Sequence, residues 1–234
     1  MSRYTLYYWS APFRGQFVRG VLTFAGQTWT EAGDEATARL MAQPVTAMPV
    51  PFMGPPVLID HDSDVAISQM PAILLYLGET LDLLPVTPAG RALAIKVVND
   101  ANDVIDELTL DGGRQMWTDE RWAAFEPRLR RWMSFWEETG RRNGLAETAG
   151  CLLGGVEPGL ADVVTAILWT TMADRFPALN AMLGEAAPLT AALSRRIAAR
   201  PPLAALADRA KNDYGDTWSG GEIEASLRKV LSEG

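Results

Sequence analysis

Strand-like patterns occur only in the first third of this 234-residue chain, and this constrains the fold more than any other feature of the sequence. Aromatic and β-branched residues predict strands at 4–9, 28–31, 57–60 and 65–67. Apolar side chains recur at helical spacing over residues 13–24 and 70–77, and residues 34–41 carry a weaker helical pattern. This order predicts a small α/β domain of βαβ-ββα form.

The remainder of the chain shows only helical patterns. Long helices are predicted over residues 92–110 and 120–142, a third begins near Gly159, and shorter ones begin at Leu189 and Pro202. The tail from residue 217 carries apolar side chains at the spacing of a short amphipathic turn-and-a-half of helix. We therefore predict an α/β domain over residues 1–80, a linker over 81–88 and an all-helical domain over 89–234.

Composition excludes several classes of function. Apolar residues make up 48% of the chain and charged residues 21%, which is ordinary for a globular protein with a core. The formal net charge of −8 opposes binding to nucleic acid or to an anionic membrane surface. With one cysteine, Cys151, and one histidine, His61, the chain has neither a cysteine cluster nor a multi-histidine site for a metal. No targeting segment or apolar run of spanning length is visible, so a cytoplasmic location is expected.

Ser10 lies where the first predicted strand ends and the first helix begins, in the segment Tyr8-Trp9-Ser10-Ala11-Pro12-Phe13-Arg14. The amides and the dipole of a helix start favour an anion, so a hydroxyl at this place can donate to a thiolate and keep it ionised. The alternative is that Ser10 is an ordinary helix cap.

Two further segments of the first domain carry candidate binding residues. Pro55 and Pro56 precede the third strand, and Pro56 is predicted to follow a cis bond, with a rigid trans loop as the alternative. Ser68 is predicted to cap the helix that follows, where Gln69 and the amide of Met70 can hold a carboxylate. The alternative is a capped amphipathic helix with an exposed glutamine.

The order and spacing of these segments resemble the cytosolic glutathione S-transferase family over roughly residues 4–210. Ser10 to Arg14 resembles the Ser-x-Pro-x-Arg start of its serine-type, theta- or zeta-like bacterial-style classes. Pro56-Val57-Leu58 resembles the cis-proline strand entry of the family, and Gln69 with the run from Ala72 to Leu77 resembles its γ-glutamyl-binding segment. Gly159 to Val164 resembles the capping box of the core helix in its helical domain.

The resemblance implies a thioredoxin-like first domain, glutathione as co-substrate without a metal, and a homodimer. It implies that Ser10 activates the glutathione thiol, with Tyr8 as the alternative activator of the tyrosine-type classes. Pro55, Pro56, Gln69 and Met70 would bind glutathione. Two departures weaken this binding: Pro55 has no N–H to donate, and Met70 replaces a serine hydroxyl.

The implied function is transfer of glutathione to a small electrophile, or reduction of a peroxide or disulfide, in detoxification. Phe13 and Trp117 are the candidates for the hydrophobic wall of the electrophile pocket, although most of the eight tryptophans are expected in the core or a dimer interface. Asp100 and Asp103 either reach the glutathione of a partner subunit or form a solvated helix face. The alternative function is a non-catalytic member of the family that carries ligands or binds proteins.

Overall fold

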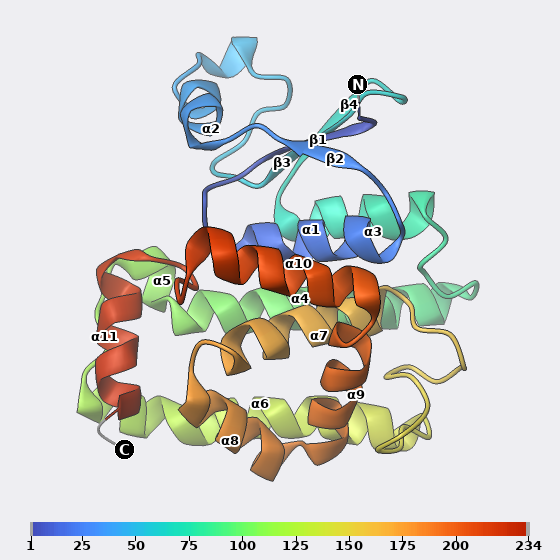
Figure 1. The fold of residues 1–234 in the computed structure, drawn as a ribbon, viewed down its shortest axis with the longest axis vertical. Coiled ribbons are helices and arrows are strands. Elements are labelled where there is room, and N and C mark those ends of the chain that lie inside the picture. Colours follow the sequence, from blue (N-terminus) through green and yellow to red (C-terminus); the bar gives the residue numbers. More distant parts are fainter. Residues whose placement is uncertain (1, 233–234) are drawn as a thin grey trace.

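The computed structural model describes residues 2–232, except for the side chain of Asp111. A four-stranded mixed sheet with its helices forms the first domain, and the second domain is entirely helical (Figure 1), as predicted. The strands are β1 (Tyr4–Tyr7), β2 (Trp29–Glu31), β3 (Val57–Asp60) and β4 (Val65–Ser68). In the described residues of the first domain the helices are α1 (Phe13–Phe24), α2 (Asp34–Met41), the single 3-10 turn η1 (Val45–Ala47) and α3 (Met70–Thr80).

The sheet has the strand order β2-β1-β3-β4. β1 and β2 are parallel because α1 returns the chain to the same end of the sheet, and the two other pairs are antiparallel. Apolar side chains of α1 and α3 cover the face of the sheet that meets the second domain (Figure 1). This is the βαβ-ββα arrangement that the strand pattern predicted.

The second domain contains helices from residue 88 to residue 232. They are α4 (Pro88–Leu108), α5 (Leu110–Gly113), α6 (Asp119–Arg142), α7 (Leu160–Ala173), α8 (Pro177–Ala186), α9 (Pro188–Ala198), α10 (Pro201–Tyr214) and α11 (Gly221–Ser232). α4 begins four residues earlier than predicted because Pro88 stands in its first turn and the Thr87 hydroxyl accepts the Gly90 N–H at 3.1 Å. A domain boundary at residues 81–88 stays a prediction.

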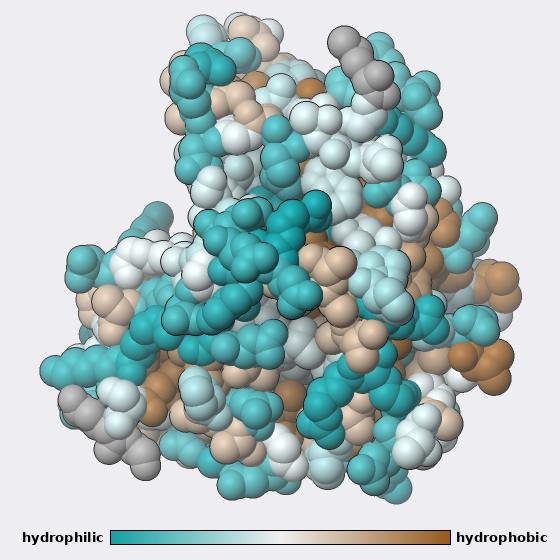
Figure 2. All heavy atoms as spheres, viewed as in Figure 1, coloured by the Kyte–Doolittle hydropathy of each residue, from teal (hydrophilic) through white to brown (hydrophobic). Residues whose placement is uncertain are grey.

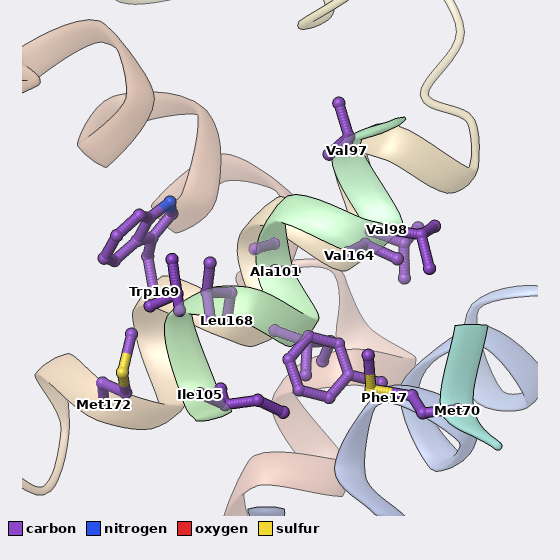
Figure 3. Packing of buried hydrophobic residues seen from close by; sticks show 14 of the residues in the cluster. Phe17, Met70, Val97, Val98, Ala101, Ile105, Val164, Leu168, Trp169 and Met172 are labelled. Carbon is purple, nitrogen blue, oxygen red and sulfur yellow. The ribbon is translucent and has the colours of Figure 1, made fainter. Parts of the chain in front are cut away.

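α7 is the central helix of the molecule. It packs against α1 of the first domain and against α4 and α9 of the second. Gly20 of α1 allows this approach, since a Cβ there would lie 2.7 Å from the Ile167 side chain of α7. Figure 3 shows side chains of α4 and α7, among them Ala101 and Leu168, in one apolar cluster with Phe17 of α1. The two domains therefore share a core.

The start of α7 explains the glycine at the predicted capping box. Asp162 is buried and accepts the N–H of Gly159 at 2.9 Å and that of Leu152 at 2.7 Å. Leu160 donates its N–H to the Leu83 carbonyl at 2.8 Å, and a Cβ on Gly159 would lie 2.8 Å from the same oxygen. A serine or threonine side chain at residue 159 would collide with this carbonyl. The capping box therefore keeps the hydrogen bond to the Asp162 carboxylate but lacks the one that a hydroxyl at residue 159 would make.

No helix among residues 2–232 is long and apolar enough to cross a membrane.

Candidate active site

The register of the sheet brings the three predicted site segments to one edge. Tyr7, the last residue of β1, lies opposite Val57, the first residue of β3, and Val57 lies opposite Ser68, the last residue of β4. Tyr7, Val57 and Ser68 thus form one row across three strands, and Ser10 lies three residues after Tyr7 in the chain. The pair of prolines directly precedes Val57, and Gln69 directly follows Ser68. The segments therefore leave the sheet side by side, although they are up to about 60 residues apart in the sequence.

Ser10 is exposed in the bend between β1 and α1. Its backbone N–H donates to the Asp34 carboxylate, with 2.7 Å between the nitrogen and Oδ1. The interpretation of Ser10 as a helix cap is wrong, because Pro12 holds the cap position and no side chain caps α1. Its hydroxyl has no hydrogen-bond partner in the described part of the chain, so it is available to a ligand.

Two amides at the start of α1 already have partners. The Phe13 N–H donates to the carbonyl of Trp218 at 3.1 Å, and the Arg14 N–H donates to the Tyr8 hydroxyl at 3.1 Å. The Phe13 ring stands edge-on to the Trp218 ring, with 5.1 Å between their centroids. The C-terminal segment therefore closes against the start of α1, and fewer free donors remain for an anion than the sequence predicted.

Tyr8 is buried beneath the start of α1. Its ring lies directly on Gly15, where an added Cβ would fall 2.2 Å from the ring carbon Cδ1. Burial raises the pKa of the Tyr8 phenol to about 12, against the opposing effect of Arg14 and Arg19 nearby. The phenol therefore stays protonated at neutral pH and its oxygen is engaged with the Arg14 amide.

Arg19 of α1 fixes the backbone of the Ser10 bend. Its guanidinium donates to the Ala11 carbonyl at 2.9 Å and to the Trp9 carbonyl at 3.3 Å. The same group forms a bidentate pair with Glu31 of β2, at 2.8 and 3.1 Å. The side chain is buried, so these bonds satisfy a charge that would otherwise be costly to remove from water.

The Pro55–Pro56 bond is cis, as predicted. Pro56 is buried and Pro55 is partly exposed, next to the start of β3. The loop before them carries exposed apolar side chains, among them Met53.

Gln69 has an unusual backbone conformation for a residue with a side chain, with φ 73° and ψ 122°. It occupies the cap position of α3, its side chain makes no capping hydrogen bond, and it is exposed. The predicted capping by Ser68 is wrong, because Ser68 is the last residue of β4. Strained backbone of this kind is concentrated at functional sites, where the surrounding structure holds it in place.

Met70 contributes only its backbone to this edge of the sheet. Its side chain is 1% exposed and lies in the apolar cluster that contains Phe17 and Ile105 (Figure 3). On the sequence alone, Met70 is a position that lacks a serine hydroxyl for contact with the ligand. The structure shows that the thioether at this position is part of the core.

Trp117 lies in an aromatic cluster of the second domain and is 5% exposed. Its indole N–H donates to the Leu108 carbonyl at 2.9 Å, and its ring is 5.4 Å from that of Trp122 and 5.1 Å from that of Phe125. Little of the ring is open to a ligand. Phe13, by contrast, is partly exposed within three residues of Ser10.

Asp100 and Asp103 line a cavity of about 520 Å³ between α4 and α6, together with Trp132 and Phe135. Asp100 is paired with Lys96, and burial together with the charges of Asp100 and Asp106 raises the pKa of Asp103. Neither residue lies in the row formed by Tyr7, Val57 and Ser68. Within residues 2–232 no group of three His, Cys, Asp or Glu side chains is placed to hold a metal ion.

Sequence reasoning missed two residues at this site, Asp34 and Trp218. Asp34 carries the ordinary sequence signal of an acidic residue in the first turn of a helix, and nothing in the sequence pairs it with Ser10. Trp218 acts through its carbonyl and its ring from more than 200 residues away, and no local pattern encodes that contact.

Comparisons with known proteins agree with this architecture. The glutathione S-transferase C-terminal domain matches residues 93–230, which is more than half of the chain. Among solved structures, NaGST-2 superposes with a TM-score of 0.69 at 20% identity, covering 89% of this chain and 97% of its own. A Nu-class glutathione S-transferase from Haemonchus contortus superposes with a TM-score of 0.68 at 19% identity, with the same two coverages of 89% and 97%. A monomeric glutathione S-transferase from the hookworm Necator americanus, Na-GST-3, gives 0.69 at 18% identity, covering 88% of this chain and 97% of that one.

The comparison with curated proteins gave no match. At identities of 18–20%, the solved structures show the fold: a thioredoxin-like domain followed by a helical domain. The matched domain shows the family, and the chain belongs to the glutathione S-transferases.

Proposed function

We propose that this protein is a serine-type glutathione transferase in which the Ser10 hydroxyl stabilises the glutathione thiolate. The observation that carries the proposal is the row formed by Tyr7, Val57 and Ser68, from which the three predicted site segments leave the sheet together. Adjacent strands are about 4.8 Å apart, so the row spans about 10 Å. An extended tripeptide has about this length. A peptide of the size of glutathione can therefore contact all three segments at once.

Each segment has a separate role in the proposal. Gln69 and the amide of Met70, at the start of α3, hold the γ-glutamyl end, where the helix dipole favours a carboxylate. Pro55 and Pro56 align the cysteinyl backbone through the Pro55 carbonyl. The thiol then lies toward Ser10, whose hydroxyl donates to the sulfur. Stabilising the thiolate makes the nucleophile available at neutral pH. The thiolate then displaces a leaving group from an electrophilic carbon, breaks the O–O bond of a peroxide with release of the alcohol, or breaks a disulfide with release of one thiolate.

Ser10 is favoured over Tyr8 by exposure and by hydrogen bonding. The Ser10 hydroxyl is exposed, whereas Tyr8 is buried and its oxygen already accepts the Arg14 N–H at 3.1 Å. Phe13 is the proposed contact to the electrophile, since it is partly exposed beside Ser10. A wall formed by Trp117 requires movement of the aromatic cluster that buries it.

Glutathione is expected to bind weakly. Pro55 offers no N–H, and the Met70 side chain points into the core. A lost neutral hydrogen bond weakens binding by about 1 kcal/mol, and a lost bond to a charged end by about 1.5–3 kcal/mol.

A homodimer, a cytoplasmic location and a role in detoxification are further proposals that rest on likeness to the family.

Substitution of Ser10 tests the function. Ser10→Ala is expected to lower kcat/KM with a model aromatic electrophile at least tenfold, which corresponds to about 1.4 kcal/mol of transition-state stabilisation. It should also raise the apparent pKa of the thiol in the pH–rate profile, because the hydroxyl stabilises the charged form. Tyr8→Phe is the matched control. If Tyr8→Phe reduces the rate and Ser10→Ala does not, the assignment of the activator is wrong.

A non-catalytic ligand carrier is the second candidate function. The observation in its favour is the Asp34 carboxylate, 2.7 Å from the Ser10 amide, because a negative charge there opposes a thiolate. Retention on glutathione-agarose with a calorimetric titration separates the two functions. Binding of glutathione without turnover of any electrophile supports the carrier, and binding with a rate that depends on Ser10 supports the transferase.

A further inference from the structure

The two peptide groups that flank Ser10 are both held by hydrogen bonds. In the group that joins Trp9 to Ser10, the carbonyl accepts the Ala11 N–H at 2.8 Å and the Arg19 guanidinium at 3.3 Å. The N–H of the same group, on its opposite edge, donates to the Asp34 carboxylate at 2.7 Å. The next peptide group is bound through the Ala11 N–H. Because peptide groups are planar and include the neighbouring Cα atoms, these bonds fix the direction in which the Ser10 side chain leaves the backbone.

Asp34 reaches the bend from a helix that is itself anchored there. α2 begins directly after Gly33, which makes the turn into the helix with a φ of 82°. One turn along α2, the Thr37 hydroxyl lies 2.9 Å from the Gly33 carbonyl and 3.3 Å from the Tyr8 carbonyl, and this side chain is 1% exposed. Asp34 and Thr37 are three residues apart, so they share one side of the helix. α2 therefore contacts the bend at Tyr8 and again at Ser10.

The bend is open to a ligand on the side of α2. Ser10 and Asp34 are both exposed. Figure 2 shows the outline of the molecule indented between α2 and the corner where α5 and α11 lie, on the side where the chain passes from β1 to α1 in Figure 1. A ligand that enters from this side meets the Ser10 hydroxyl next to α2.

The charge of Asp34 has no counter-ion. Within residues 2–232 it forms no ion pair, whereas the charged side chains on the α1 side of the bend are paired. Arg19 pairs with Glu31 at 2.8 Å, and Arg14 pairs with Asp106 of α4 at 3.0 Å. A carboxylate beside the proposed thiolate raises the pKa of the thiol. The hydrogen bond and the charge of Asp34 therefore act in opposite directions on the proposed reaction, and substitutions can separate them.

We propose that Asp34 is a positioning residue for Ser10, an inference that rests on the proposed function of Ser10. Asp34 holds the Ser10 amide, and the hydroxyl then faces the sulfur of bound glutathione before the reaction begins. A donor that is already oriented spends no free energy on reorganisation during the reaction, and a small misplacement of a reacting group lowers the rate. Asp34 acts through the backbone and does not touch the substrate.

Two variants separate the hydrogen bond from the charge. Asp34→Asn removes the charge and keeps an oxygen that accepts the Ser10 N–H, whereas Asp34→Ala removes both. With both substrates saturating, kcat of Asp34→Ala is expected to be lower than kcat of Asp34→Asn by a factor of about five or more. In the pH–rate profile, the apparent pKa of the thiol should fall by about 0.5 pH units in Asp34→Asn, because a nearby negative charge is lost. This pKa should be higher in Asp34→Ala than in Asp34→Asn, because the hydroxyl is no longer held toward the sulfur.

Glu35→Ala and Glu35→Gln are the matched controls. Glu35 is also an exposed acidic residue in the first turn of α2, and it pairs with Arg39. Both Glu35 variants should keep the kcat and the pH–rate profile of the wild type. If Glu35→Ala is as slow as Asp34→Ala, the effect comes from the stability of α2 and the positioning role is wrong.

The rate of the Ser10→Ala variant distinguishes the two levels of the argument. A rate that depends on Ser10, together with equal kcat values for Asp34→Ala and Asp34→Asn, overturns the positioning role alone. A rate that Ser10→Ala leaves unchanged overturns the proposed function, and the role of Asp34 with it.

Discussion

Replacement of Gln69 by glycine is expected to stabilise the protein while it weakens glutathione binding. Gln69 has φ 73° and ψ 122°, a conformation that a residue with a Cβ adopts only at a cost. Strained backbone of this kind costs about 1–3 kcal/mol. Glycine removes this cost, but it gives the unfolded chain more conformational freedom, which offsets about 0.5–1 kcal/mol.

The expected net gain is about 0.5–2 kcal/mol in the free energy of unfolding. Gln69→Ala is the matched control because alanine keeps the Cβ and therefore the strain. It removes only an exposed side chain without a capping bond, so its stability should lie within about 0.5 kcal/mol of the wild type. The comparison of the glycine and alanine variants therefore isolates the backbone from the side chain.

Urea denaturation at constant pH measures the effect, and an unchanged slope with denaturant shows that the unfolded states are comparable. For a chain of this length, 1 kcal/mol corresponds to roughly 2–4 °C in Tm. Both variants should weaken glutathione alike, since both lose the amide side chain. A glycine variant no more stable than the alanine variant would refute the argument from strain.

Substitutions at three further positions have expected outcomes. Gly15→Ala should destabilise the protein by about 1–3 kcal/mol because the new Cβ lies 2.2 Å from the Tyr8 ring. The loss of stability should be smaller in a Tyr8→Ala background, which a double-mutant cycle measured by urea denaturation tests. Met70→Ser should destabilise by about 2–5 kcal/mol, whereas Met70→Leu should change stability by less than about 1.5 kcal/mol; equal curves for the two variants would contradict the burial of Met70. Burial acts to raise the pKa of Glu224, but the amides it caps and the Arg228 guanidinium outweigh burial and lower it. The pKa of Glu224 is lower in the folded than in the unfolded state, so its charge stabilises the fold fully at pH values above the unfolded pKa near 4.5. This stabilisation is lost as the pH falls through the folded pKa. Glu224→Gln should therefore be less stable than the wild type at pH 7, and the difference in the free energy of unfolding should vanish in acid.

Much of the fold was predictable because its signals are local. Alternating and helical spacings of apolar residues lie within single elements, so strands at 57–60 and helices such as α1 and α6 were found with small errors at their ends. α8 was missed because it is a short helix of 10 residues, and only three residues separate it from the end of α7. The tail forms a helix of 12 residues, longer than predicted, since its buried side chains find their partners only in the folded chain.

The candidate site was predictable as a set of segments that lie together and not as a set of contacts. Ser10, Pro56 and Gln69 follow from motifs along the chain, and the cis bond at Pro55–Pro56 was predicted correctly. The partners of the Ser10 bend were not, because Asp34 is fixed by how α2 returns to the sheet, and Trp218 comes from the far end of the chain.

The contact between α1 and α7 has a consequence for the order of events during synthesis. The residues that close the core over α1 are not made until the ribosome has passed residue 173, well after the sheet and α3 have emerged. At about 5–20 residues per second, the apolar side of α1, which ends at Phe24, waits for roughly 7–30 s until α7, which ends at Ala173, is complete. During that interval the nascent first domain presents an apolar surface that α7 has not yet covered, and this surface is open to chaperones.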